Sequence, residues 1–126
     1  ACDLTKGGNI LNHPIKAIAL GQNCSLSTAI SNDYGYEFVL SKEIELLGKS
    51  GDSVLLISSS GTSANIKNAV ETSRNLGLNY LLVHGFDSIE CEGGSNLHIP
   101  SDSYFVIEDI SMALVHHYMA SKQKET

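Results

Sequence analysis

The fold of this chain is decided by residues 51–65, Gly51-Asp52-Ser53-Val54-Leu55-Leu56-Ile57-Ser58-Ser59-Ser60-Gly61-Thr62-Ser63-Ala64-Asn65. The apolar centre of this stretch is short and rich in leucine and β-branched residues, which is typical of a strand covered on both faces of a parallel sheet. A hydroxyl-rich turn follows the strand directly, and a helical pattern begins after the turn. A strand, a turn and a helix in this order predict one β–α unit of an α/β fold.

Comparable segments occur along the rest of the chain. We expect buried parallel strands at Ile15–Leu20, Ser53–Ser58 and Tyr80–His84, with a weaker strand at Asn96–Pro100. Apolar residues at helical spacing fill the gaps: one helix ends at Gly48, another stops at Gly77, and the last covers about Tyr104–Lys122. Strands and helices that alternate in this way predict a three-layer α/β/α fold with a doubly wound parallel sheet.

Length and composition predict one domain over residues 1–126, with an ordinary apolar content of 42%. The chain starts inside a helical pattern without Met, so we expect an N-terminal helix and a first strand to be missing.

A net charge of −6 disfavours nucleic acid as a partner. No apolar run approaches the ~20 residues of a membrane span. The three cysteines lack metal-site spacing, which favours free thiols in a cytoplasmic protein.

The turn after Ile57 has the features of an anion site. Bare amides and the positive dipole end at a helix start favour phosphate, and Gly61 allows close approach of the backbone. Hydroxyl groups of Ser58, Ser60 and Ser63 can add donors. There is no G-K-[ST] ending and no G-x-G-x-x-G motif, which argues against a P-loop or a dinucleotide site. The alternative is that Thr62 or Ser63 only caps the helix.

Three motifs follow one another along the chain: Asn32-Asp33-Tyr34-Gly35, then Gly51-Asp52 with the loop Ser58–Ser63, then a final helix that carries Glu108-Asp109 and His116. Together they resemble the sugar isomerase (SIS) domain family, and in particular bacterial phosphoheptose isomerases, which act on sedoheptulose 7-phosphate. In the final helix the family has Gln-Glu and a histidine eight positions after the Gln. The resemblance covers essentially the whole chain.

The resemblance implies a set of site residues. The substrate-binding positions are Asn32, Asp33, Ser58, Ser59, Ser60, Ser63 and Glu108. The catalytic positions are Asp3 and His116, and the resemblance implies a zinc ion on Asp3, Glu108 and His116. Two positions depart from the family: Asp3 replaces a glutamate and is one methylene shorter, and Glu108 replaces a neutral Gln. The shorter side chain would displace the Asp3 carboxylate by more than about 1 Å, and the negative charge of Glu108 would tighten a cation site or repel a sugar phosphate.

The mechanism implied is ketose–aldose isomerisation, with Asp3 as the base and His116 as the acid or metal ligand. Glu108 and His116 lie about 12 Å apart along a straight helix, so one ion can join them only with long reach or a bent helix. His117 points about 100° away from His116, which favours packing. We expect no chemical role for the isolated residues His13, His84 and His98.

Two further functions stay open. SIS domains also serve as non-catalytic regulatory or adaptor modules that bind a phosphosugar, and the departures at Asp3 and Glu108 keep this reading open. A related isomerase for capsule or other surface polysaccharides, including lipopolysaccharide, would share the chemistry.

The resemblance also implies a homotetramer, with the final helix and residues 33–47 as interfaces. Asn32–Gly35 can be a simple turn, and Tyr34 and Tyr36 are expected to pack.

Overall fold

A computed structural model describes residues 1–10, 12 and 14–123, with the side chain of Gln123 left out. His13 lies outside the described residues. The chain divides into two compact units, which we describe separately. One unit combines residues 1–19 with the segment from residue 108 onward, and the other unit is Leu20–Ile107.

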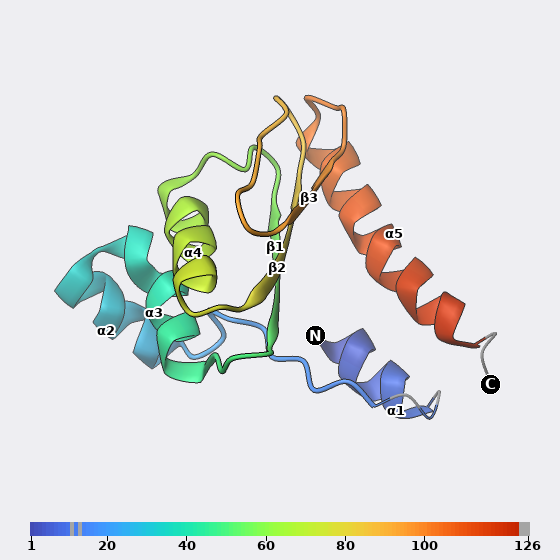
Figure 1. The fold of residues 1–126 in the computed structure, drawn as a ribbon, viewed down its shortest axis with the longest axis horizontal. Helices are drawn as coiled ribbons and strands as arrows, with labels where there is room; N and C mark the ends of the chain where they lie inside the picture. The colour runs from blue at the N-terminus through green and yellow to red at the C-terminus, as the bar shows by residue number, and fades with distance from the viewer. Residues whose placement is uncertain (11, 13, 124–126) are drawn as a thin grey trace. The chain divides into compact units, whose positions relative to one another are not determined.

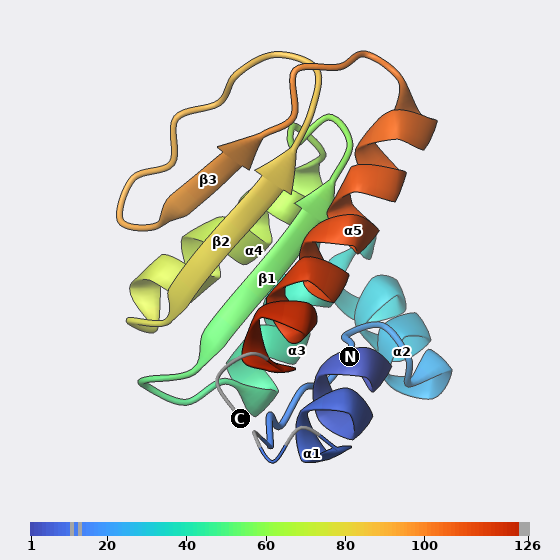
Figure 2. The same ribbon diagram turned by 90° about the vertical axis from the view of Figure 1, so that its right-hand side faces the viewer.

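The Leu20–Ile107 unit holds a parallel sheet and the helices that pack on it. Its strands are β1 (Ser53–Ser58), β2 (Asn79–His84) and β3 (Ser95–His98), in the order β1-β2-β3. Its helices are α2 (Cys24–Tyr34), the 3-10 turn η2 (Tyr36–Phe38), α3 (Val39–Leu47) and α4 (Ala64–Asn75). Helix α4 lies behind β1 and β2 in Figure 2, and α3 packs on α4 (Figure 1). The predicted α/β class and parallel sheet are confirmed.

Apolar side chains from the helices and strands form the core of this unit. The buried cluster consists of Ile44, Leu56, Ile66, Ala69, Leu78 and Leu82. Helix α4 stops where the sequence predicts, because Gly77 takes a φ of 66° that favours glycine. Helix α3 likewise ends before Gly48. The elements follow the predicted β1–α4–β2 order, and the parallel pairing of the strands places their carboxyl ends at one edge of the sheet.

The other unit contains η1, a π-helical turn (Asp3–Gly7), the short helix α1 (Gly8–Ile10) and most of α5 (Tyr104–Gln123). Helix α5 confirms the predicted final helix.

None of the helices in the described residues combines the length and apolar character needed to cross a bilayer. The three cysteines are free.

The prediction of a strand at Ile15–Leu20 is wrong for this structure. Residues 14–19 form no regular element. The backbone N–H of Ala17 donates to Oγ1 of Thr5, and the Thr5 hydroxyl donates to the Ala17 carbonyl. Ile18 is 69% exposed. A strand is stabilised by the ladder of a neighbouring strand, and here the hydrogen bonds of Ala17 go to one side chain instead. The strand predicted at Asn96–Pro100 is present but runs from Ser95 to His98.

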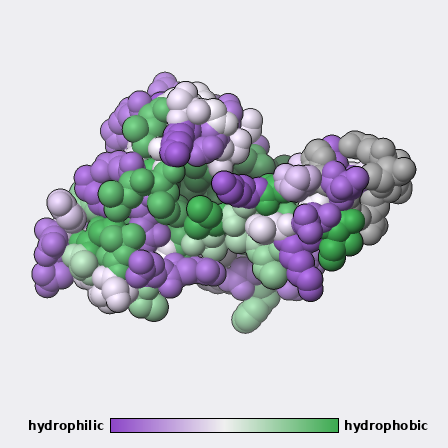
Figure 3. All heavy atoms as spheres, turned by 90° about the horizontal axis from the view of Figure 1, so that it is seen from below, coloured by the Kyte–Doolittle hydropathy of each residue, from purple (hydrophilic) through white to green (hydrophobic). Residues whose placement is uncertain are grey.

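Packing of Tyr34 and Tyr36 was also predicted, and the structure contradicts it. Their exposed fractions are 58% and 69%. The ring of Tyr34 lies 5.3 Å from the Lys42 ammonium, which is a cation–π contact at the surface. Figure 3 shows hydrophobic side chains exposed among hydrophilic ones on the face seen from below. Tyr34 ends α2 and Tyr36 begins η2, and most of each side chain remains in contact with solvent.

Glu43 is the buried carboxylate of α3, and it supports a testable prediction about stability. It is 3% exposed, and its two oxygens accept hydrogen bonds from the Gly21 amide (2.8 Å) and the Ser27 hydroxyl (2.9 Å). Glu43→Ala leaves both donors unpaired, so we expect a loss of about 1–3 kcal/mol in the free energy of unfolding. Urea titration followed by circular dichroism measures it.

The control for Glu43 is Glu45 on the same helix. Glu45 pairs with Lys42 at 2.7 Å, and both side chains are partly exposed. Glu45→Ala should therefore cost less than about 1 kcal/mol. Equal losses for the two variants would show that the buried contacts of Glu43 do not stabilise the fold.

Candidate functional site

The serine loop, which we define as Ser58–Ser63, joins β1 to α4 at the carboxyl edge of the sheet. Gly61 takes a φ of 67°, and a Cβ there would lie 2.5 Å from Cδ1 of Ile89 and 3.1 Å from Cβ of His84. Both the backbone conformation and the lack of space require glycine at this position. The loop is therefore pressed tightly against the end of β2.

Two serines of the loop bond to its own backbone. Oγ of Ser58 accepts a hydrogen bond from the Gly61 amide at 3.1 Å. Oγ of Ser60 accepts from the Thr62 amide at 3.3 Å and from the Thr62 hydroxyl at 3.2 Å. Two amides that could bind an anion are thus held by hydroxyl groups of the loop itself. An anion that takes these amides has to displace weak neutral hydrogen bonds, which a charge-assisted bond can do.

The other two serines are free to bind a ligand. The hydroxyls of Ser59 and Ser63 form no hydrogen bond with any residue that the structure describes. Ser63 occupies the N-cap position of α4, but its side chain makes no capping bond. The simple capping role therefore does not account for this hydroxyl. With the positive end of the α4 dipole beside them, these groups suit a phosphate.

Asn32 and Asp33 lie in the last turn of α2 and are exposed. Nδ2 of Asn32 donates to Oδ1 of Asp33 at 2.9 Å. Within the described residues, no hydrogen bond connects this pair to the serine loop. The structure therefore brings Asn32 and Asp33 together but does not join them to the phosphate site.

Asp3 and His116 meet in the unit formed by the two ends of the chain. Oδ2 of Asp3 lies 3.6 Å from Nε2 of His116, which is an ion-pair distance once the imidazole is protonated. Their side chains are 59% and 61% exposed and face a hollow of about 420 Å³. The hollow is lined by Asp3, Lys6, Gly7, Ile10, His116, Met119 and Ala120. A carboxylate and an imidazole that share an open hollow are suited to proton transfer.

Comparison with known proteins identifies the relatives of this chain. No protein-family model matches it. It is 34% identical over 105 residues to a probable phosphoheptose isomerase of Thermoplasma acidophilum, covering 82% of this chain and 58% of the relative. It is 35% identical over 118 residues to the phosphoheptose isomerase of Helicobacter pylori strain P12, covering 92% and 62%. The chain therefore spans less than two thirds of the length of these curated relatives.

The solved structure of phosphoheptose isomerase from Neisseria gonorrhoeae matches with a TM-score of 0.81 at 28% identity, covering 96% of this chain and 70% of that one. Over most of its length the chain is similar to phosphoheptose isomerases. The resemblance found in the three motifs is thereby confirmed. The phosphoheptose isomerase from Francisella tularensis matches with the same TM-score, covering 94% of this chain and 68% of that one.

Glu108 takes the place of the Gln that the resemblance implies. The structure does not place it beside the Asp3–His116 pair. It is exposed on α5, eight residues before His116, a rise of about 12 Å along the helix. No group of three His, Cys, Asp or Glu side chains that could hold a metal occurs in the described parts of the chain. Catalytic zinc has three protein ligands, so Asp3 and His116 fit as two of them and Glu108 does not complete the set. Zinc binding stays a prediction.

Sequence reasoning assigned no role to His84, yet the structure places it under the serine loop. His84 is fully buried and ends β2 beside Ser58, its partner in the β1–β2 register. The carboxyl ends of parallel strands are where α/β proteins bind ligands, and this rule could have drawn attention to it. His98, the next residue in register on β3, stacks on His84 with ring centroids 5.2 Å apart.

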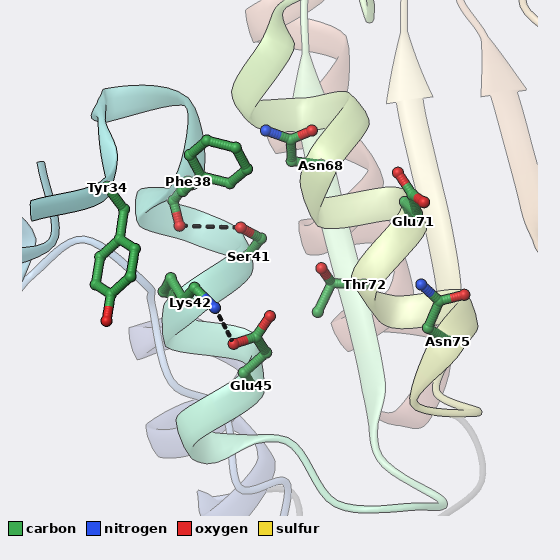
Figure 4. Close-up of a pocket in the computed structure, with 9 residues that line it drawn as sticks. All are labelled: Tyr34, Phe38, Ser41, Lys42, Glu45, Asn68, Glu71, Thr72 and Asn75. Atoms are coloured by element: carbon green, nitrogen blue, oxygen red, sulfur yellow. Dashed lines mark hydrogen bonds and ion pairs between the residues drawn. The ribbon is translucent and has the colours of Figure 1, made fainter.

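A second hollow of about 400 Å³ lies between α3 and α4 (Figure 4). Lys42 points to Glu45 within it, and Asn68, Glu71, Thr72 and Asn75 line the opposite wall from α4. Tyr34 of the Asn32–Gly35 motif lines this hollow, but none of the catalytic, substrate-binding or metal residues that the resemblance implies does. It is therefore separate from the serine loop and gives no reason to move the candidate site.

Proposed function

We propose that the protein is a ketose–aldose isomerase of phosphosugars that converts sedoheptulose 7-phosphate to a heptose 7-phosphate. The names of its relatives support this substrate class. The chain spans less than two thirds of the length of those relatives, so their activity is a proposal for this protein. The observation that carries the proposal is the 3.6 Å pair of Asp3 and His116 at one hollow.

The pair supplies both proton transfers of the reaction. The Asp3 carboxylate removes the proton from the carbon next to the carbonyl, and protonated His116 gives its proton to the carbonyl oxygen. The product of this step is a neutral enediol. Asp3 then returns its proton to the former carbonyl carbon, while neutral His116 takes the hydroxyl proton of the neighbouring carbon. The double bond has then moved by one carbon, and both residues regain their starting state.

The serine loop would bind the phosphate group of the substrate. The hydroxyls of Ser59 and Ser63 donate directly, and the amides of Gly61 and Thr62 become available once Ser58 and Ser60 release them. This arrangement explains how a chain with a net charge of −6 holds an anion by local donors. As part of the same proposal, Asn32 and Asp33 bind sugar hydroxyls, and Glu108 lines the substrate site.

The proposal also includes the zinc ion, the location, the assembly and the pathway that the family resemblance implies. In a zinc-bound form Asp3 and His116 are proposed as two ligands of the ion in place of their acid–base roles, because a ligating imidazole is unprotonated; the ion would supply Lewis-acid polarisation of a carbonyl. We further propose that the protein is a cytoplasmic homotetramer. Its product would enter lipopolysaccharide or capsule synthesis.

The full-length protein, incubated with sedoheptulose 7-phosphate, should yield an aldose phosphate detectable by NMR of the anomeric protons. Metal content is measured on the same sample, and a chelator treatment tests its contribution. A protein that binds the phosphosugar by calorimetry but leaves it unconverted would overturn the proposed activity. That result would favour the non-catalytic SIS module instead.

A further inference from the structure

The carboxyl ends of the three strands place one serine and two histidines side by side. Ser58 pairs with His84, and His84 pairs with His98, in the parallel register. Paired residues of adjacent strands direct their side chains to the same face of a sheet. The hydroxyl of Ser58 and the imidazole of His84 are therefore neighbours at the edge where the serine loop begins.

One nitrogen of the His84 ring has no hydrogen-bond partner among the residues that the structure describes. Nδ1 lies 3.2 Å from the carbonyl of Gly85, and a carbonyl can only accept, so Nδ1 carries the hydrogen. In the neutral ring Nε2 is then an acceptor. It is buried and forms no hydrogen bond with any described residue. Buried polar atoms are almost always paired, so an unpaired one indicates a partner that is present only in another state.

The serine loop lies directly on this ring. A Cβ built on Gly61 would be 3.1 Å from Cβ and 3.4 Å from Cγ of His84. The Gly85 amide donates to the Ser59 carbonyl at 2.8 Å, which fixes the loop to the end of β2. The ring is held from its other side by His98, whose Nε2 donates to the Phe86 carbonyl at 2.8 Å. The position of the imidazole is thus set before any ligand binds.

We propose that Nε2 of His84 accepts the hydrogen of the Ser58 hydroxyl when a phosphate takes the Gly61 amide. In this structure the Gly61 amide donates to Oγ of Ser58. A phosphate that captures that amide leaves Ser58 without the donor that orients it. The hydroxyl then turns to the waiting acceptor on the adjacent strand. The Ser58 hydroxyl thereby exchanges a partner within the loop for one on β2, and the Gly61 amide becomes available to the anion.

This inference rests on the proposed binding of phosphate to the serine loop and deepens it. It makes His84 a positioning residue, where the sequence alone suggested no chemical role. It also gives Ser58 an indirect part in binding, while Ser59 and Ser63 contact the ligand. The exchange costs the loop little, because each broken bond is replaced by another of the same kind.

A double-mutant cycle on the full-length protein tests the exchange, with inorganic phosphate as the probe in calorimetry. His84→Asn keeps a nitrogen at the Nδ1 position and removes Nε2. We expect it to lower phosphate affinity about tenfold when Ser58 is present and less than about twofold in the Ser58→Ala background. His84→Gln, which keeps an acceptor near the Nε2 position, is the matched control and should retain most of the affinity.

A second measurement needs no substitution. The ¹⁵N resonance of His84 Nε2 in the unmodified protein should shift when phosphate is added, because the atom gains a hydrogen bond. An unchanged Nε2 resonance under saturating phosphate overturns the inference, even if the variants fold poorly. Equal effects of His84→Asn in both backgrounds overturn it while leaving phosphate binding intact. Failure of the unmodified protein to bind phosphate or sugar phosphate overturns the proposed function as well.

Discussion

Replacing His116 by alanine is expected to lower kcat for isomerisation by about 10²- to 10⁴-fold, the usual contribution of a general acid or base. The reason is the position of the imidazole, 3.6 Å from the Asp3 carboxylate at the same hollow. His116 is largely exposed, so the substitution removes no buried contact and should leave the free energy of unfolding nearly unchanged. Steady-state kinetics and thermal unfolding of the full-length variant measure both quantities.

His117 provides the control, since it is the neighbouring residue on α5, of the same type and also exposed. It points about 100° away from His116 around the helix, so His117→Ala should change kcat less than about twofold.

Asp3→Asn should lose activity as His116→Ala does, because an amide cannot act as a base. Full activity of His116→Ala would remove His116 from the mechanism, and equal losses in the two histidine variants would point to a general effect on the helix.

Gly61→Ala is expected to weaken phosphate binding about tenfold or more. A residue other than glycine is strained by about 1–3 kcal/mol at the φ of 67°. The added methyl group would also meet Cδ1 of Ile89 at 2.5 Å and Cβ of His84 at 3.1 Å, so the serine loop has to move away from the sheet. Displacement of the loop misplaces the amides that bind the anion. Calorimetry with inorganic phosphate and urea unfolding measure the two effects.

Gly77 separates the backbone effect from the steric one. Its φ of 66° nearly equals that of Gly61, but a Cβ there meets no atom within 4 Å. Gly77→Ala should therefore destabilise the protein by about 1–3 kcal/mol and leave phosphate affinity unchanged. The account fails if both variants bind phosphate as the unmodified protein does.

The sequence predicted those parts of the fold that depend on local pattern. Residues 53–58 and 64–75 form the expected strand and helix because their apolar spacing and the glycines that follow act within a few residues. Residues 15–20 have the composition of a strand but form none, since a strand also needs hydrogen bonds from a neighbour that composition does not specify.

The candidate site was predictable only as far as its residue types. The serine loop was found from the hydroxyls and the helix start that follows them. Its division into paired serines (Ser58 and Ser60) and free serines (Ser59 and Ser63) depends on side-chain rotamers that the sequence does not fix. His84 was overlooked because its place beside Ser58 arises from pairing between strands far apart in the sequence. The meeting of Asp3 with His116 came from family motifs rather than from spacing.

The central claim is that the serine loop binds the phosphate group of the substrate. Amide ¹H–¹⁵N spectra of the full-length protein, recorded during titration with sedoheptulose 7-phosphate, test it most directly. The account predicts that the Gly61 and Thr62 amides shift downfield together, with inorganic phosphate producing the same shifts at higher concentration. Unchanged resonances for both amides, with shifts confined to another part of the chain, would contradict it.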